Sequence, residues 1–207
     1  AVGGVENLIL SAPGYTRIDA EITGRGAHSG FEPEKGISAI KIASVIISRL
    51  NIGRIDAETT ANVGTIRGGS ARNAIAETAY FEAEIRSRNV EKLREQTQFF
   101  EETINNVLLD YPGAKVNLEM ITEFEPYKIE KNHPVIQQLI ENVHKIGRKP
   151  NFVKSGGGSD VSIFRKHDIE VVCIGSCYYN AHTTREYVSI SEMVKGVELC
   201  ERLVMIN

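Results

Sequence analysis

Two histidines lie in stretches rich in glycine and small polar residues. His28 stands in Gly-Arg-Gly-Ala-His-Ser-Gly, and His182 stands in Asn-Ala-His-Thr-Thr-Arg-Glu. An imidazole can bind a metal ion or transfer a proton near neutral pH, and glycines let a backbone approach a ligand closely. A solvated surface histidine is the alternative at both positions. The other three, His133, His144 and His167, stand among charges and helix signals and are interpreted as surface residues.

A third candidate loop spans residues 155–160, Ser-Gly-Gly-Gly-Ser-Asp. It lacks the Lys-Ser/Thr of a P-loop and the glycine spacing of a dinucleotide-binding loop. Ser159 and Asp160 more simply cap a following helix. The chain has no Gly-x-Ser-x-Gly motif of a serine hydrolase. The residues alone therefore indicate glycine loops that close over a small substrate beside a histidine.

The three cysteines, Cys173, Cys177 and Cys200, are too few for a disulfide framework and favour a reducing, cytoplasmic setting. Cys173, Cys177 and His182 could form part of a zinc site. Cys173, however, stands in an apolar run, where a buried structural thiol is common, and a closed zinc site needs four ligands. We therefore interpret these cysteines as structural.

The composition is that of a soluble globular protein. The 207 residues are 42% hydrophobic and 25% charged, with a formal net charge of -3. Without a basic run, a nucleic-acid partner is not expected. No apolar run reaches the roughly 18 residues that cross a bilayer, so no membrane partner is expected either. The chain begins at Ala1 without a methionine or a signal peptide, and we expect it to be part of a longer protein.

Hydrophobic periodicity predicts a first domain of the α+β class. Helices are expected over residues 34–50 and from an N-cap at Asn89 to Leu108. Alternating apolar residues predict strands over residues 15–23, 59–66, 77–87 and 116–120. The order β-α-β-β-α-β is the ferredoxin-like pattern, with a four-stranded antiparallel sheet and two helices on one face. We assign this domain to residues 12–124.

The remaining sequence predicts an incomplete α/β segment. After Pro126 the expected elements are a helix over 134–145, a strand over 151–154, a short helix to Lys166, a buried strand over 169–175 and a helix from Ser191. The order α-β-α-β-α is typical of a parallel α/β layer. Two short strands make a poor sheet, so other segments must supply the neighbouring strands.

Five motifs, in order, resemble those of the di-zinc peptidases, which include tripeptidase T, acetylornithine deacetylase and the glutamate carboxypeptidases. They are Gly-Arg-Gly-Ala-His-Ser-Gly with Pro-Glu-Lys-Gly-Ile-Ser-Ala-Ile (24–40), Gly-Gly-Ser-Ala-Arg-Asn (68–73), Glu-Ile-Arg-Ser (84–87), Gly-Gly-Gly-Ser-Asp (156–160) and Asn-Ala-His-Thr-Thr-Arg-Glu-Tyr (180–187). The last two are most similar to the tripeptidase T-like branch. The first three resemble that family's lid, or dimerisation, domain.

The resemblance implies a zinc metallopeptidase that hydrolyses short peptides through a metal-activated water. His182 is similar to a zinc ligand. His28 is similar to the lid histidine that reaches the partner subunit's active site and donates to the substrate carbonyl oxygen. A homodimer formed through the lid domain is therefore implied.

Four further residues take substrate-binding roles by the same resemblance. Asn73 and Arg86 are similar to residues that hold the substrate's backbone and carboxylate, which a planar guanidinium can bind with two hydrogen bonds. Gly157 and Gly158 would line the substrate channel with backbone groups. At Asn73 the sequence Asn-Ala-Ile-Ala departs from the family's Asn-Ile-Ile/Val-Pro.

The family's other metal ligands and its general base precede the lid domain, and none is matched here. Residues 1–4 resemble the stretch after the last acidic ligand. Residues 1–11 and 125–207 are therefore interpreted as remnants of the zinc-binding catalytic domain. We expect two zinc ions in the full enzyme and no activity from this chain alone.

Other functions stay open at this point. The same lid could serve as a non-catalytic dimerisation module or bind carboxylate ligands without turnover. Aminopeptidase, deacetylase and carboxypeptidase relatives share these loops, so the motifs do not fix the substrate. A ferredoxin-like RNA-binding domain is disfavoured because the central strands lack clustered aromatic residues.

Overall fold

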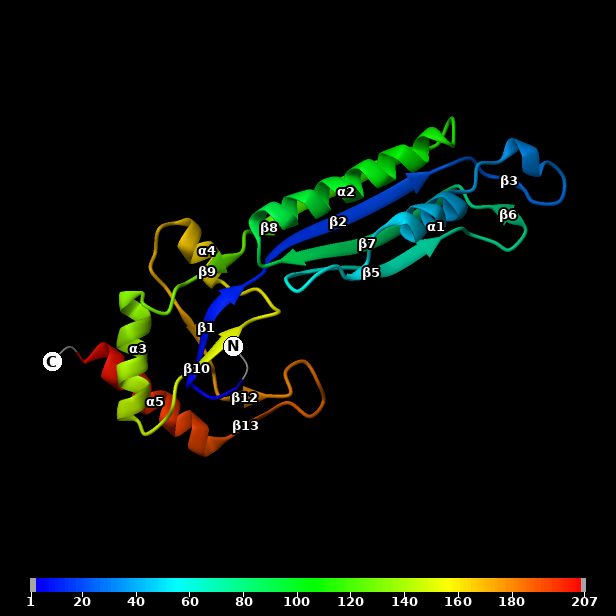
Figure 1. Ribbon diagram of the computed structural model, residues 1–207. Helices are drawn as coiled ribbons and strands as arrows, with labels where there is room; N and C mark the ends of the chain where they lie inside the picture. The colour runs from blue at the N-terminus through cyan, green and yellow to red at the C-terminus, as the bar shows by residue number, and fades with distance from the viewer. Residues whose placement is uncertain (1–2, 206–207) are drawn as a thin grey trace. The chain divides into compact units, whose positions relative to one another are not determined.

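The structure is a computed structural model that describes residues 3–205 of the chain (Figure 1). It divides into two compact units. The central unit is Gly14–Glu125, and the terminal unit comprises the residues up to Pro13 and those from Pro126 onward. Within the described residues, no helix is long and apolar enough to cross a membrane.

The central unit is built on an antiparallel sheet in the order β4-β5-β7-β2-β8. Its strands are β2 (Gly14–Thr23), β4 (Gly53–Arg54), β5 (Thr59–Gly68), β7 (Thr78–Ser87) and β8 (Lys115–Phe124). The four strands predicted from alternation are present, and each is longer than predicted or begins within a residue of its predicted start. The two-residue strand β4 was not predicted, since it is too short to show a period.

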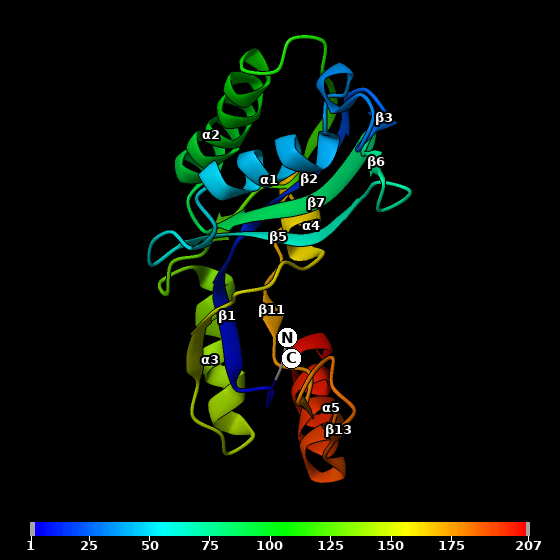
Figure 2. The same cartoon turned by 90° about the vertical axis from the view of Figure 1, so that its right-hand side faces the viewer.

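Two helices, α1 (Ala39–Arg49) and α2 (Val90–Leu109), cover one face of this sheet (Figure 2). Asn89 caps α2 as predicted, and its side chain accepts a hydrogen bond from the Lys92 amide at 3.0 Å. The helix expected over 34–50 begins later, because the 3₁₀ turn η1 (Pro33–Lys35) is followed by extended backbone at Gly36. The fully buried core includes Ile18, Ile22, Ile42, Ile46, Phe81, Ile85, Phe100 and Ile104.

The terminal unit contains a mixed sheet around β1 (Asn7–Ala12). β10 (Asn151–Lys154) pairs with it in parallel, and β9 (Tyr127–Lys128) and β11 (Cys173–Ile174) pair with it antiparallel. β1 is the neighbouring strand that the sequence required but did not identify. Helices α3 (Pro134–Lys145), α4 (Val161–Lys166) and α5 (Ile190–Val204) and a hairpin of β12 (Tyr178–Tyr179) and β13 (Tyr187–Val188) complete the unit.

The prediction of a buried strand over 169–175 in a parallel layer is wrong. Only Cys173 and Ile174 form a ladder, it is antiparallel, and Ile169 is 51% exposed. The reason lies on β1: its Ser11 and Ala12 pair with β9, which leaves Leu8 and Ile9 for β11. An apolar run signals burial, but the partner strand decides how many of its residues form a ladder.

Candidate functional site

The structure brings His28 and Asn73 together at one end of the central sheet. The short strands β3 (Ala27–His28) and β6 (Ala74–Ile75) pair antiparallel, with His28 opposite Ala74. The Ser29 amide donates to the Asn73 carbonyl oxygen at 3.0 Å. His28 on β3 and Asn73, the residue just before β6, are far apart in the chain but lie close together beyond the end of β2.

The His28 ring is oriented by its own loop. The Gly30 amide donates to His28 Nδ1 at 3.1 Å, and the Phe31 ring lies 4.3 Å from the imidazole, centroid to centroid. A nitrogen that accepts cannot carry the proton, so the neutral ring carries it on Nε2. His28 is exposed, and its Nε2–H can therefore donate to a group outside the loop.

Gly24 fixes where this loop leaves the sheet. A Cβ at Gly24 would clash with the Ile37 carbonyl oxygen, while Arg25 and Ile37 exchange backbone hydrogen bonds at 2.9 Å. The sequence suggested that the glycines of this motif allow a ligand to approach. At Gly24 the close neighbour is instead the chain's own backbone, so this glycine holds the His28 loop against the segment before α1.

Arg86 lies near the other end of β7, paired with Tyr15 on β2. Its Nε and Nη2 donate to the two carboxylate oxygens of Glu84 at 2.9 and 3.0 Å, and its guanidinium lies 5.0 Å from the Tyr15 ring centroid. The hydrogen bonds to Glu84 raise the pKa of Arg86. The Arg86 side chain is 32% exposed, so solvent and small ligands can reach the ion pair.

Arg86 and Asn73 do not meet within one chain. β7 runs from Thr78, beside the β6 turn, to Arg86 and Ser87. At about 3.3 Å per residue, this separation is about 25 Å. The substrate-binding pair suggested by the sequence is therefore split between the two ends of the sheet.

His182 lies at the tip of the β12–β13 hairpin in the terminal unit and is exposed. Its φ of 61° is left-handed, as are those of Cys177 (66°) and Asn180 (54°). Its amide donates to Glu186 Oε2 at 2.9 Å. Left-handed non-glycine residues are uncommon and cost free energy, so three within six residues mark a loop with a constrained backbone.

Gly157 and Gly158 are also exposed, in the loop between β10 and α4. The Ser155 hydroxyl accepts from the Gly157 amide at 3.1 Å and donates to its carbonyl at 2.8 Å. A Cβ at Gly157 would meet no atom within 4 Å. The loop is thus held by Ser155 and leaves space on one side of the Gly157 backbone.

Of the three cysteines, Cys177 has the surroundings of a structural thiol, whereas Cys173 is partly buried and Cys200 is exposed. Cys177 is buried, its Sγ donates to the Glu192 carbonyl oxygen at 3.1 Å, and burial raises the pKa of its thiol. None of the three cysteines forms a disulfide within the described residues. Among residues 3–205, no three His, Cys, Asp or Glu side chains gather closely enough to hold a metal ion. His182 therefore has no second and third ligand beside it among these residues.

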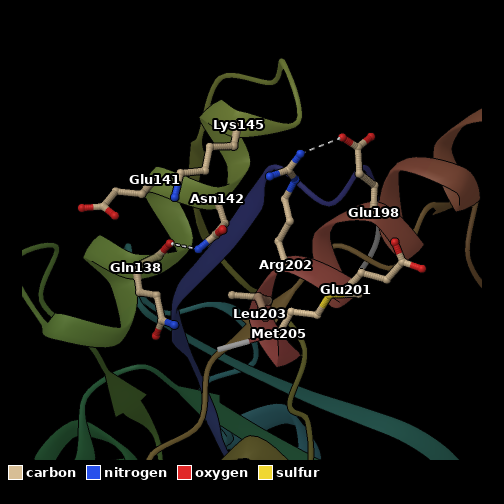
Figure 3. Close-up of a pocket in the computed structure, with 9 residues that line it drawn as sticks. All are labelled: Gln138, Glu141, Asn142, Lys145, Glu198, Glu201, Arg202, Leu203 and Met205. Carbon is tan, nitrogen blue, oxygen red and sulfur yellow. Dashed lines mark hydrogen bonds and ion pairs between the residues drawn. The ribbon is translucent and has the colours of Figure 1, made fainter. Parts of the chain in front are cut away.

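A cavity of about 510 Å³ in the terminal unit contains none of the predicted residues (Figure 3). It lies between α3 and α5 and is open and highly charged. Arg202 approaches Glu198 at 3.7 Å, and Asn142 donates to the Gln138 carbonyl at 2.9 Å. The remaining lining residues are Glu141, Lys145, Glu201, Leu203 and Met205. Its charges are largely balanced by one another, so the geometry favours no particular ligand.

Sequence reasoning missed Glu84 and Tyr15, which hold Arg86. The signal for Glu84 was present: residues two apart on a strand share a face, so Glu84 and Arg86 must lie side by side. Tyr15 could be assigned only from the register of β2 against β7.

Comparisons with known proteins identify the family to which the central unit is similar. Residues 10–112 match the family M20_dimer, the peptidase dimerisation domain. The chain contains an M20 peptidase dimerisation domain. This confirms the family resemblance seen in the five motifs.

Relatives extend the likeness beyond the M20 dimerisation domain. The uncharacterised protein YqjE of Bacillus subtilis is 37% identical over 98% of this chain and 54% of its own length. Crystal structures of aminopeptidase PepT from Bacillus cereus (33% identical, TM-score 0.89) and a tripeptidase from Staphylococcus aureus (32% identical, TM-score 0.91) each match 99% of this chain and 54% of theirs. The chain thus spans about half the length of the proteins that it matches.

Proposed function

We propose that this chain supplies the lid, the dimer contacts and one metal ligand of a zinc-dependent metallopeptidase that hydrolyses short peptides, as a tripeptide aminopeptidase does. The observation that carries the proposal is the His28–Asn73 pair, in which the loop turns Nδ1 inward and leaves Nε2–H to donate. The likeness to PepT over 99% of the chain supports the peptide substrate.

Each predicted site residue has its own role in the proposed reaction. His28 donates from Nε2 to the carbonyl oxygen of the scissile bond as negative charge develops there, acting in the partner's active site. Asn73 hydrogen-bonds the substrate backbone beside it. Arg86 binds the substrate carboxylate through its two-pronged guanidinium, and Gly157 and Gly158 present backbone groups along the channel.

His182 is the proposed metal ligand of this chain. Its exposed imidazole stands on a loop whose left-handed residues fix the backbone, as expected of a preorganised ligand. Two zinc ions, when bound, would supply a Lewis acid and lower the pKa of a water. The other ligands would come from polypeptide beyond these residues, and the terminal unit would then be part of the zinc-binding catalytic domain.

The proposal also covers the fold class of the central domain, its assembly and its cellular location. We assign residues 12–124 to the ferredoxin-like class, since the order β5-β7-β2-β8 with α1 and α2 on one face fits βαββαβ. The proposed assembly is a homodimer through this domain. Three cysteines without a disulfide among the described residues favour the cytoplasm.

A hydrolysis assay tests this function. A longer polypeptide that joins these residues to a segment bearing the missing ligands should cleave a tripeptide only with zinc, and His182→Ala should abolish cleavage. The 207-residue chain alone should be inactive. Zinc-dependent cleavage by the 207-residue chain, or full activity of the His182→Ala variant, would overturn the assignment.

A non-catalytic carboxylate-binding module is the second candidate. Arg86 and the two residues that hold it, Glu84 and Tyr15, all belong to this chain, so this binding group needs no residue from elsewhere. Binding of triglycine to the 207-residue chain in the presence of a chelator, lost in Arg86→Ala, would favour it if the longer polypeptide shows no hydrolysis.

A further inference from the structure

The terminal unit contains a second cavity, which lies beside the end of β1. Its volume is about 550 Å³, within the roughly 300–1,000 Å³ that small-molecule sites occupy. Its walls come from β1, from β10, and from β9 with the four residues that follow it. None of the residues assigned to the proposed peptidase site lines this cavity. Its shape and charge therefore serve something other than the proposed peptide cleavage.

The floor of this cavity is apolar. Ile129 is buried in the core of the terminal unit, and Leu10 of β1 and Phe152 of β10 pack against that core while remaining partly exposed. Val153 of β10 adds to the same lining. An apolar group that covers this floor removes hydrocarbon surface from water, which favours binding.

Hydrogen bonds hold the wall that follows β9 in place. The Ile129 amide donates to the Leu10 carbonyl oxygen at 2.7 Å, which ties the start of this wall to β1. The Lys131 carbonyl oxygen accepts from Nε2 of Gln137 at 2.7 Å, which ties its end to α3. The cavity is therefore formed before any ligand arrives, and a ligand does not bear the cost of ordering it.

Three lysines and one glutamate contribute charge to the cavity. Lys128 pairs with Glu130 at 2.7 Å, so these two charges balance each other. In the part of the chain that the structure describes, no carboxylate pairs with Lys131 or Lys154. Two positive charges therefore stand unbalanced beside an apolar floor.

The two unbalanced lysines lie on the same side of β10. Nζ of Lys131 lies 4.1 Å from the centroid of the Phe152 ring, a cation–π contact that holds the ammonium near the cavity. Lys154 follows Phe152 by two residues on the same strand, so both point to one face of the sheet. An ammonium has three N–H donors, so Lys131 keeps donors free for a ligand while it contacts the ring.

We propose that this cavity binds a small aromatic carboxylate. The ring of the ligand packs on Leu10, Ile129 and the Phe152 ring, and its carboxylate accepts hydrogen bonds from Lys131 and Lys154. Each half of the ligand matches one half of the cavity, so an acid without a ring and a ring without a charge both bind more weakly.

The test titrates benzoate into the 207-residue chain and follows the methyl NMR signals of Leu10, Ile129 and Val153. Benzoate should move all three, with a dissociation constant on the order of 1 mM, as expected of so small a ligand. Acetate, which lacks the ring, and benzyl alcohol, which lacks the charge, should leave the signals in place at the same concentrations.

Substitutions of exposed lysines test the charged half without disturbing the core. Lys154→Glu should weaken benzoate binding by about tenfold or more, because attraction becomes repulsion, and Lys131→Ala should weaken it severalfold. Lys149→Glu is the matched control, since Lys149 is exposed in the same unit but does not line the cavity. It should bind benzoate as wild type does. The amide spectrum of each variant establishes that it is folded.

Methyl signals that stay in place up to about 20 mM benzoate, equal binding by wild type and Lys154→Glu, or equal weakening in Lys154→Glu and Lys149→Glu each overturns the proposed site. Binding by the 207-residue chain that is lost in the longer polypeptide also overturns it, because other residues then fill the cavity. The measurement involves neither zinc nor peptide hydrolysis, so its outcome is independent of the peptidase assignment.

Discussion

Arg86 and Glu84, two residues apart on β7, form a two-pronged ion pair, with Nε–Oε1 and Nη2–Oε2 distances of 2.9 and 3.0 Å. The guanidinium therefore already holds a carboxylate in the geometry that we propose for substrate. Glu84 preorganises Arg86 over Tyr15 and at the same time competes with a ligand carboxylate for the same hydrogen-bond donors.

Removing this competition should tighten carboxylate binding. Glu84→Gln is expected to increase the affinity of the 207-residue chain for acetate severalfold and Arg86→Lys to weaken it, because lysine cannot form two parallel bonds. The Arg86 Nε–H signal in ¹⁵N NMR reports binding. Glu84→Gln should change stability by less than about 1 kcal/mol, since the pair is partly exposed. Glu21→Gln, an exposed acid on β2, is the control, and equal gains in both variants would argue against a role for Glu84.

His28 should act across the dimer. In the longer, zinc-loaded polypeptide, His28→Ala is expected to lower kcat by about 10²–10³, the usual effect of removing one donor to a developing oxyanion. Mixing equal amounts of inactive His28→Ala and His182→Ala subunits should restore about a quarter of wild-type activity, because half of the random dimers carry one complete site. A mixture as inactive as its components would place His28 outside the partner's site.

The core of the central unit should depend on Phe100. This ring is fully buried, whereas the preceding Phe99 is 40% exposed. Phe100→Ala should destabilise the protein by about 3–5 kcal/mol, through lost burial and the cavity left behind. Phe99→Ala should cost about 0.5 kcal/mol, as surface substitutions do. Urea unfolding of both variants checks the difference, and equal costs would contradict the observed orientation of α2.

Asp56 should make stability depend on pH in the acid range. Its carboxylate accepts from the Glu58 and Thr59 amides at 2.6 and 2.9 Å and pairs with Lys92 at 3.0 Å. The Glu58 amide and Lys92 lower the pKa of Asp56 to about 2. Because the pKa of Asp56 is lower in the folded state, the ionised carboxylate stabilises the fold at pH values above its unfolded-state pKa of about 3.9. This contribution is lost as the pH falls toward about 2.

Asp56→Asn should therefore be less stable than wild type at pH 7, with a difference that narrows below about pH 4. Urea unfolding between pH 2 and 7 measures it. Asp110→Asn, whose ion pair with Arg49 spans 3.8 Å, should change stability little. If the difference in unfolding free energy between wild type and Asp56→Asn were constant with pH, the charge of the Asp56 carboxylate would contribute nothing to the stability of the fold.

The sequence alone predicted the four long strands and the two helices of the central unit, and the family. Period-two alternation along β2 and β7 and the cap at Asn89 are local signals, because side-chain direction and capping depend on neighbouring residues. The glycine-histidine motifs are likewise contiguous, and they were sufficient to indicate the M20 relationship that residues 10–112 confirm.

Tertiary structure decided what depends on distant partners. Only pairing showed that β1 is the centre of the terminal sheet and that β11 is short and antiparallel to it. Only the ladder of β3 with β6 joined His28 to Asn73, and only the length of β7 separated both from Arg86. A local pattern specifies which face of a strand is buried, but register and neighbours are set by long-range packing, which a single sequence does not display.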